Sequence, residues 1–295
     1  MKNNAFSTHG LGGKTSPFLL TKDEWTYFID LLNKCSSAPT SIEDVQEHIY
    51  SKLDGKFKTS WDRLIETYAF STMVKDAIEI NKKLRVQCGF WGDGGKASFL
   101  FLSQNIVDYA NFICVDHIND LNKVIQEVQG GKVSSEMKSK FVKICNDLSN
   151  HAQTYLKNAQ PLIESISTFY EDIENCEEEL NRVKDLIPQI PMYNSDDFGM
   201  ANVTVIFLMS SIIDLADSKE GTVPILNKIH GIWDALSYDL KETGEDIEKG
   251  IVDVDSFIAG LELELAIEDW RVVGEEANNF YQNINDFKKC NYLST

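Results

Sequence analysis

Small and apolar residues recur through the middle of the chain with the spacing of one very long helix. Successive members of this series lie three or four positions apart, in strict alternation. They are Ala152, Tyr155, Ala159, Leu162, Ile166, Phe169, Ile173, Cys176, Leu180, Val183 and Ile187. This heptad spacing is typical of a helix whose apolar seam faces another long helix. Extended back to Ser134 or Ser135, the series predicts a helix of ~50 residues, which Pro161 should kink or divide.

Other apolar series predict helices on both sides of this one. The first expected helix begins at Thr21 with a capping box, and the next two cover 41–53 and 61–85, the latter with Ser60 as N-cap. After a glycine-rich break at 87–95, a helix covers 97–128. Beyond the long helix, a second long helix returns toward Gly250 with a kink near Pro224, and a last helix covers 255–288. Pro188 and Pro191 stop the long helix, and residues 192–197 form a polar tip. Only residues 203–209 also fit a short strand.

These elements define the expected fold class. It is all-α, an elongated bundle of long antiparallel helices that form a tail, with a short apolar head. A small hairpin in the head is the alternative that residues 203–209 leave open. We expect residues 1–16, rich in Gly, Ser, Thr and Asn, to be loose. Residues 17–295 then form a single elongated helical domain, with the head element at about 188–213.

Charge and composition exclude several classes of partner. The formal net charge is −18, and 43% of the residues are hydrophobic. A surface this acidic repels phosphate groups, so we expect no nucleic-acid binding and no electrostatic docking on anionic lipids. The first residues contain no apolar signal-peptide core, and no stretch reaches the ~18–20 apolar residues of a spanning helix. We expect a soluble protein that is secreted or released without a visible signal peptide.

No motif predicts catalysis or a bound cofactor. The glycine–lysine segments 9–15 and 89–97 lack the glycine spacing of a phosphate-binding loop. The histidines are isolated, and a solvated helix face explains the acidic run 171–179. The six cysteines have no paired spacing and are interpreted as reduced packing residues. We expect no enzyme activity, no catalytic residues, no cofactor and no metal.

An uncharged run, residues 198–213, follows the polar tip. It fits either the buried start of a helix or a concealed lipid-insertion element. We favour insertion, because the end of an elongated hairpin has little neighbouring protein to cover an apolar run. The residues expected to insert are Phe198, Met200, Val203, Val205, Ile206, Phe207, Leu208, Met209, Ile212 and Ile213. Residues 97–107 are a second, weaker candidate.

Segments across nearly the whole chain carry a family resemblance. They are Phe18–Trp25 with its Leu-Thr helix start, Ala38-Pro39-Thr40 in place of Leu-Pro-Thr, Ser60-Trp61 followed by Ile78, Ile232–Leu240 with Trp233, and Ala266–Phe280 with Trp270 and Ala277. In this pattern the chain resembles the cytolysin A superfamily of α-helical pore-forming toxins. It is most similar to the XaxA/YaxA-type cytotoxins, the haemolysin BL-type components and the helical insecticidal crystal proteins.

The resemblance implies a soluble monomer that refolds on a membrane and assembles into a ring. Its implied partners are the target-cell membrane, further copies of the chain and a second toxin component. The sequence departs from the family in its short central apolar stretch, which follows Asp196-Asp197. A pore made by this chain alone, a role as a partner component and no insertion at all therefore stay open. The alternative function is an intracellular coiled-coil scaffold or tether without membrane activity.

Overall fold

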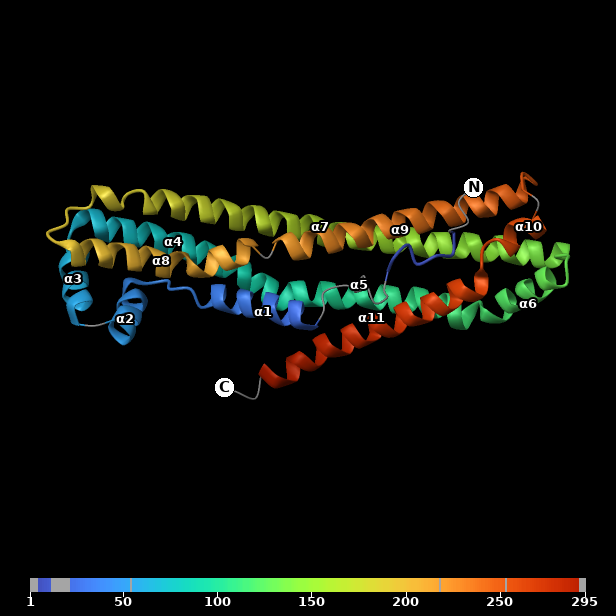
Figure 1. Ribbon diagram of the computed structural model, residues 1–295, viewed down its shortest axis with the longest axis horizontal. Helices are drawn as coiled ribbons and strands as arrows, with labels where there is room; N and C mark the ends of the chain where they lie inside the picture. Colours follow the sequence, from blue (N-terminus) through green and yellow to red (C-terminus); the bar gives the residue numbers. More distant parts are fainter. Residues whose placement is uncertain (1–4, 12–21, 54, 218, 253, 292–295) are drawn as a thin grey trace. The chain divides into compact units, whose positions relative to one another are not determined.

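The computed structural model describes residues 5–11, 22–53, 55–217, 219–252 and 254–291, and its regular elements are all helical (Figure 1). They are α1 (Lys22–Ser36), α2 (Ile42–Lys52), α3 (Gly55–Ile65), α4 (Tyr68–Phe90), η1 (Trp91–Gly95), α5 (Lys96–Asn111), η2 (Phe112–Asp116), α6 (Ile118–Gln129), α7 (Ser135–Lys184), η3 (Ile187–Gln189), α8 (Ser195–Asp217), α9 (Lys219–Glu248), α10 (Val254–Ala259) and α11 (Leu263–Asn291). The all-α fold class is thus confirmed. Residues 203–209 lie inside α8, so the strand alternative is wrong.

The described residues form two compact units. Unit 1 comprises the residues up to 24, residues 96–164 and those from 222 onward, whereas unit 2 comprises residues 25–95 and 165–221. Both units therefore contain part of α7. The sequence pattern had suggested a single domain over 17–295.

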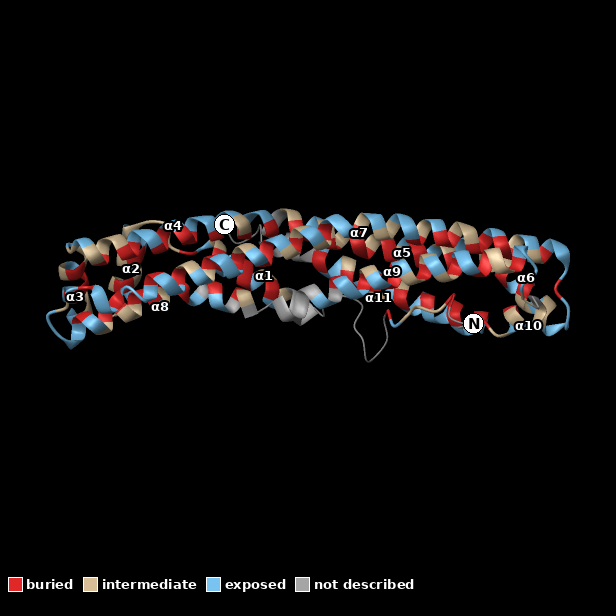
Figure 2. Ribbon diagram, turned by 90° about the horizontal axis from the view of Figure 1, so that it is seen from above, coloured by how far each residue is buried: buried red, intermediate tan, exposed pale blue. Residues whose placement is uncertain are grey.

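The long helix predicted from the apolar series is confirmed as α7, Ser135–Lys184. Every member of the series is buried except Tyr155, which is half-buried. Pro161 lies inside the helix and does not divide it. Pro161 and Lys157, whose carbonyl loses its usual helical partner, are both exposed, so water can satisfy that carbonyl. Along the long helices, buried positions alternate with exposed ones, as heptad packing requires (Figure 2).

The core of unit 1 contains a cluster of four aromatic residues, one from each of four helices. Tyr109 of α5 lies 5.1 Å from Trp233 of α9 and 4.9 Å from Trp270 of α11, measured between ring centroids. Tyr155 of α7 completes the cluster, 6.1 Å from Tyr109 and 5.2 Å from Trp233. Aromatic pairs at these separations add to the stability that burial supplies. The cluster therefore ties α5, α7, α9 and α11 together.

The N-terminal segment 5–11 packs into unit 1, in place of the loose stretch expected over 1–16. Ala5, Phe6 and Leu11 are buried. The indole N–H of Trp270 donates a hydrogen bond to the Phe6 carbonyl at 2.9 Å, and the Phe6 ring stacks on Phe141. The rest of 1–16, and Thr21 of the expected capping box, lie outside the described residues.

In unit 2, α4 contacts both the second part of α7 and α8. Lys83 pairs with Glu179 at 3.0 Å, and Gln87 donates to Asp172 at 2.9 Å. Trp91, directly after α4, contacts Phe169, so later residues of this segment contact earlier residues of α7. These pairs show that α4 and α7 run antiparallel. Helix α8 packs on α3 and α4.

Several predicted helix boundaries are wrong. Ser60 lies inside α3 instead of capping a helix, and the helical structure is interrupted between α3 and α4. The glycine-rich break at 87–95 is helical, because α4 continues to Phe90 and a π-helical turn follows. The Trp91 ring covers Gly95 in that turn, at a position that a Cβ would occupy. The expected helices over 97–128 and 255–288 are interrupted at η2 and by residues 260–262, where Glu262 has a φ of +48°.

A glycine sets the close approach of α5 and α11 in unit 1. A Cβ on Gly274 would lie 2.7 Å from the Cβ of Ala110. We expect Gly274→Ala to lower the free energy of unfolding, because overpacking of about 1–3 kcal/mol outweighs a helix-propensity gain of about 1 kcal/mol. Adding Ala110→Gly should restore most of the loss in chemical denaturation.

Gly231→Ala is the matched control, because no atom lies within 4 Å of its added Cβ. It should leave the stability unchanged or raise it by up to about 1 kcal/mol. A Gly274→Ala protein as stable as the Gly231→Ala protein would show that α5 and α11 are not held this closely.

Candidate functional site

Helix α8 contains all ten residues expected to insert, and the structure divides them between two environments. Met200, Val205, Leu208, Met209 and Ile212 are buried, and Val203 and Phe207 are half-buried. Phe198, Ile206 and Ile213 are exposed, with exposed fractions of 53%, 63% and 41%. The run is therefore neither wholly core nor wholly surface.

The exposed side of α8 carries no charge between residues 198 and 213. It presents Phe198, Ile206 and Ile213, with half-buried Asn202 and exposed Ser210 between them at helical spacing. A surface helix normally presents charged residues on this side. The outer side of α8 is thus suited to an environment less polar than water.

Helix α2 contacts α8 through one pair of rings, on the side of α8 away from Ile206. The His48 imidazole stacks on Phe207, with ring centroids 3.6 Å apart and ring planes 11° from parallel. Desolvation lowers the pKa of His48, and the nearby charge of Lys52 lowers it further. His48 is consequently neutral at pH 7, which suits an apolar contact.

The first turn of α8 is fixed to α3 by a buried carboxylate. The Asp197 side chain is fully buried and forms an ion pair with Arg63 of α3. It also accepts a hydrogen bond from the Tyr193 N–H at 3.0 Å, while the Asp197 N–H donates to the Asn194 side chain at 3.0 Å. We call this group, Arg63 with Tyr193, Asn194 and Asp197, the α3–α8 lock.

The charge on Asp197 is maintained by its partners. Burial acts to raise the pKa of this carboxyl, but hydrogen bonds from Arg63, the Tyr193 N–H and Ser60 outweigh burial and hold the pKa below its ordinary value of 3.8. The sequence pattern places Asp196-Asp197 in a polar tip and gives no sign of the lock. No local pattern links Asp197 to Arg63, because 134 positions separate them.

The weaker candidate, residues 97–107, lies in α5 of unit 1. Phe99, Leu102 and Ile106 are buried, and only Phe101 is an exposed large apolar residue among them. These side chains belong to the core that α5 forms with α11. The segment therefore presents one large apolar side chain to solvent, whereas α8 presents three.

The cysteines behave as packing residues where they are described. Cys35, Cys88, Cys145 and Cys176 are buried thiols outside any disulfide, and Cys114 is a half-buried thiol that donates to the Ile267 carbonyl. Burial raises the pKa of the Cys145 thiol, so it stays protonated. Among the described residues, no three His, Cys, Asp or Glu side chains gather as a metal site. No helix in the described ranges is both long and apolar enough to cross a bilayer.

The fold matches those of two bacterial toxin proteins. The Bacillus cereus HblL1 toxin component is 11% identical, with a TM-score of 0.59 over 87% of this chain and 93% of its own. Soluble SmhA, of the tripartite α-pore-forming toxin Smh from Serratia marcescens, is 11% identical, with a TM-score of 0.60 over 90% of this chain and 92% of its own. No protein-family model and no curated protein sequence matches the chain.

These matches define the class of fold. The chain has the helical-bundle fold of α-pore-forming toxin proteins, and the resemblance predicted from the sequence is confirmed at this level. At 11% identity the likeness does not assign an activity.

The α3–α8 lock predicts how stability depends on pH. Because the folded pKa of Asp197 lies below the ordinary 3.8, its stabilisation is complete above that value and is lost as the pH falls through the folded pKa. Asp197→Asn should reduce the free energy of unfolding by about 1–3 kcal/mol at pH 7. The difference from the unchanged protein should stay constant down to about pH 4 and shrink below it.

Thermal melts of both proteins between pH 7 and pH 2 measure this difference. Asp196→Asn, at the exposed neighbouring position, is the control and should melt like the unchanged protein. A difference that already disappears between pH 7 and pH 5 would contradict the assigned role of Asp197.

Proposed function

We propose that the protein is an α-helical pore-forming toxin, or one component of such a toxin, and that α8 is its membrane-entering element. The observation that supports this most strongly is the uncharged outer side of α8, with Phe198, Ile206 and Ile213 exposed. The toxin fold of the neighbouring structures supports the same class. In this account the resting protein is a monomer. On a target membrane it assembles with further copies of itself or with a second toxin component.

The energetics of α8 favour transfer to lipid without any chemical step. Large apolar side chains gain about 1.5–3 kcal/mol each when they leave water. The buried residues of α8, such as Leu208 and Ile212, exchange a protein core for lipid, so they contribute little net free energy. Phe198, Ile206 and Ile213 leave water, and because each is about half exposed, together they supply about 2–5 kcal/mol. That gain opposes the loss of the α3–α8 lock.

The length of the uncharged run limits how α8 can enter. Residues 198–213 extend ~24 Å as a helix, which is less than the ~30 Å hydrocarbon thickness of a bilayer. A helix this short crosses only where the bilayer thins locally. Several copies side by side would keep their more polar sides out of the lipid. Thr204, on the side of α8 away from Ile206, is the polar residue that such an assembly would turn inward.

A charge on the outer side of α8 tests the proposal. We expect Ile206→Asp to fold normally, because Ile206 faces solvent, and to lose at least tenfold in dye release from lipid vesicles, because an aspartate opposes entry into lipid by about 2.5–3.5 kcal/mol. Leu208→Asp is a poorer test, because Leu208 is buried and its replacement would also disturb folding.

Ile251→Asp is the matched control, since Ile251 is 60% exposed and lies in unit 1. It should release dye like the unchanged protein. Release should be measured with the chain alone and with a cognate second component. If vesicles stay intact under every combination, the toxin proposal is rejected in favour of a scaffold or tether. If the Ile206→Asp protein is fully active, α8 is not the entering element.

A further inference from the structure

Three cysteines from three different helices of unit 2 lie close together in its core. Cys35 belongs to the last turn of α1, Cys88 to the end of α4 and Cys176 to the second part of α7. All three are buried. The Cys35 and Cys88 side chains share a hydrogen bond, and Cys176 is near enough for its charge to act on Cys88. We call these three residues the thiol cluster.

The buried side of α1 holds Cys35 against the rest of unit 2. Phe28, Leu31, Leu32 and Cys35 follow one another at helical spacing, and each is 3% exposed or less. Cys35 is therefore part of the apolar side by which α1 packs. Residues 36–87 separate it from Cys88, so the fold, and not the local spacing, brings the two thiols into contact.

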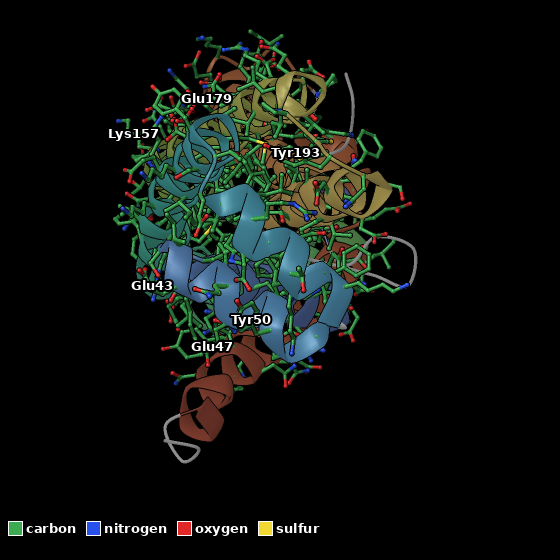
Figure 3. All side chains as sticks on the ribbon, turned by 90° about the vertical axis from the view of Figure 1, so that its left-hand side faces the viewer. Glu43, Glu47, Tyr50, Lys157, Glu179 and Tyr193 are labelled. Carbon is green, nitrogen blue, oxygen red and sulfur yellow. The ribbon has the colours of Figure 1, made fainter. Side chains whose placement is uncertain are left out.

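Polar contacts next to the cluster hold Cys88 beside α7. Gln87, directly before Cys88, donates a hydrogen bond to Asp172 at 2.9 Å. Cys176 lies one turn further along α7, between Asp172 and Glu179, which Figure 3 labels. Cys88 thus has a neighbouring thiol on α1 and another on α7, and the thiol on α1 is the one that shares its hydrogen bond.

The thiols of the cluster are unreactive while they stay buried. The hydrogen bond with Cys35, together with burial, raises the pKa of the Cys88 thiol, and burial raises the pKa of the Cys176 thiol. Because only a thiolate attacks a disulfide, exchange requires a local opening that brings a thiol into water. The ends of helices open most readily, and Cys35 lies at the end of α1.

We propose that Cys35 and Cys88 form a disulfide bond, which joins α1 to α4, when the protein meets a small disulfide such as glutathione disulfide. The exposed Cys35 thiol loses its proton to water, and its thiolate attacks one sulfur of glutathione disulfide, which releases one glutathione thiolate. The Cys88 thiolate then attacks the Cys35 sulfur of this mixed disulfide and releases the second glutathione. Two protein thiols are oxidised, and one glutathione disulfide is reduced to two glutathione molecules. The inference does not rest on the proposed function, because it involves no membrane.

Peptide mass spectrometry of the full chain identifies the bond. The protein is incubated overnight with glutathione disulfide, its remaining thiols are alkylated, and it is digested without reduction. We expect the main product to be a pair of peptides joined through Cys35 and Cys88. Dithiothreitol should separate the two peptides.

The melting temperature supplies a second readout. The bond closes a loop over residues 35–88, and a cross-link of this kind restricts the unfolded chain. We expect oxidation to raise the melting temperature by about 5–10 °C, and dithiothreitol to reverse the rise. The Cys35→Ala protein, treated in the same way, should show no rise.

Cys145→Ala is the matched control, because Cys145 is also a buried cysteine but lies in unit 1. It should give the same joined peptides and the same rise as the unchanged protein. Cys176→Ala should also form the bond, since it removes only the neighbouring thiol on α7. Circular dichroism checks that each variant is folded, and the unchanged protein gives the joined peptides without any substitution.

Three results would overturn the inference. The first is Cys35 and Cys88 both alkylated after the incubation, and the second is a main product that joins Cys88 to Cys176. The third is glutathione that stays on Cys35 while Cys88 is alkylated, because the two thiols would then not return to contact. None of these results bears on dye release, so the proposed function would stand or fall separately.

Discussion

The proposed function of this protein depends on the incomplete burial of α8. The helix is uncharged from residue 198 to residue 213, yet α3 and α4 can cover only one side of it. Met200, Val205, Leu208, Met209 and Ile212 occupy that side. Phe198, Ile206 and Ile213 face water, at a free-energy cost that a bilayer would remove. The same helix thus stabilises unit 2 through its buried side, and in the proposed function its exposed side favours departure from unit 2.

Polar contacts at the start of α8 oppose that departure. Asp197 is buried, and it stays ionised because Arg63 and the Tyr193 N–H satisfy it. Breaking such a pair leaves an uncompensated charge, which makes the lock specific to one packing of α3 and α8. The contact between His48 and Phe207 adds a second, apolar restraint from α2. The Asp197 restraint is not expected to weaken between pH 7 and pH 5, because the pKa of Asp197 lies below its ordinary 3.8.

The sequence was most informative where the apolar spacing is regular. The heptad series predicted α7 almost to the residue, because a single long seam must keep one register over its whole length. Inward positions such as Trp233 and Trp270 also follow from their spacing. The predicted helix boundaries were wrong where tertiary contacts decide whether a helix continues. The glycine-rich residues 87–95 stay helical because the Trp91 ring packs over Gly95 and against Phe169.

The candidate site was only partly predictable. Spacing identified α8 as apolar, but it could not divide ten apolar residues into buried and exposed sets, since apolar residues occur on every side of this helix. The α3–α8 lock joins segments more than 100 positions apart, and no local pattern records such a contact. One feature of the first turn of α8 could nevertheless be predicted from the sequence. Asn194 and Asp197, three positions apart before an apolar run, have the spacing of a helix cap.

The central claim is that α8 leaves α2 and α3 when the protein meets a membrane. Spin labels on cysteines introduced at two exposed positions, Glu47 of α2 and Ile206 of α8, measure the separation of the two helices directly. In solution the pair should give one short, narrow distance distribution, because His48 and Phe207 are in contact. With enough phosphatidylcholine vesicles to bind the protein, the account predicts a shift to longer, broader distances. An unchanged distribution on membranes that release their dye would contradict it.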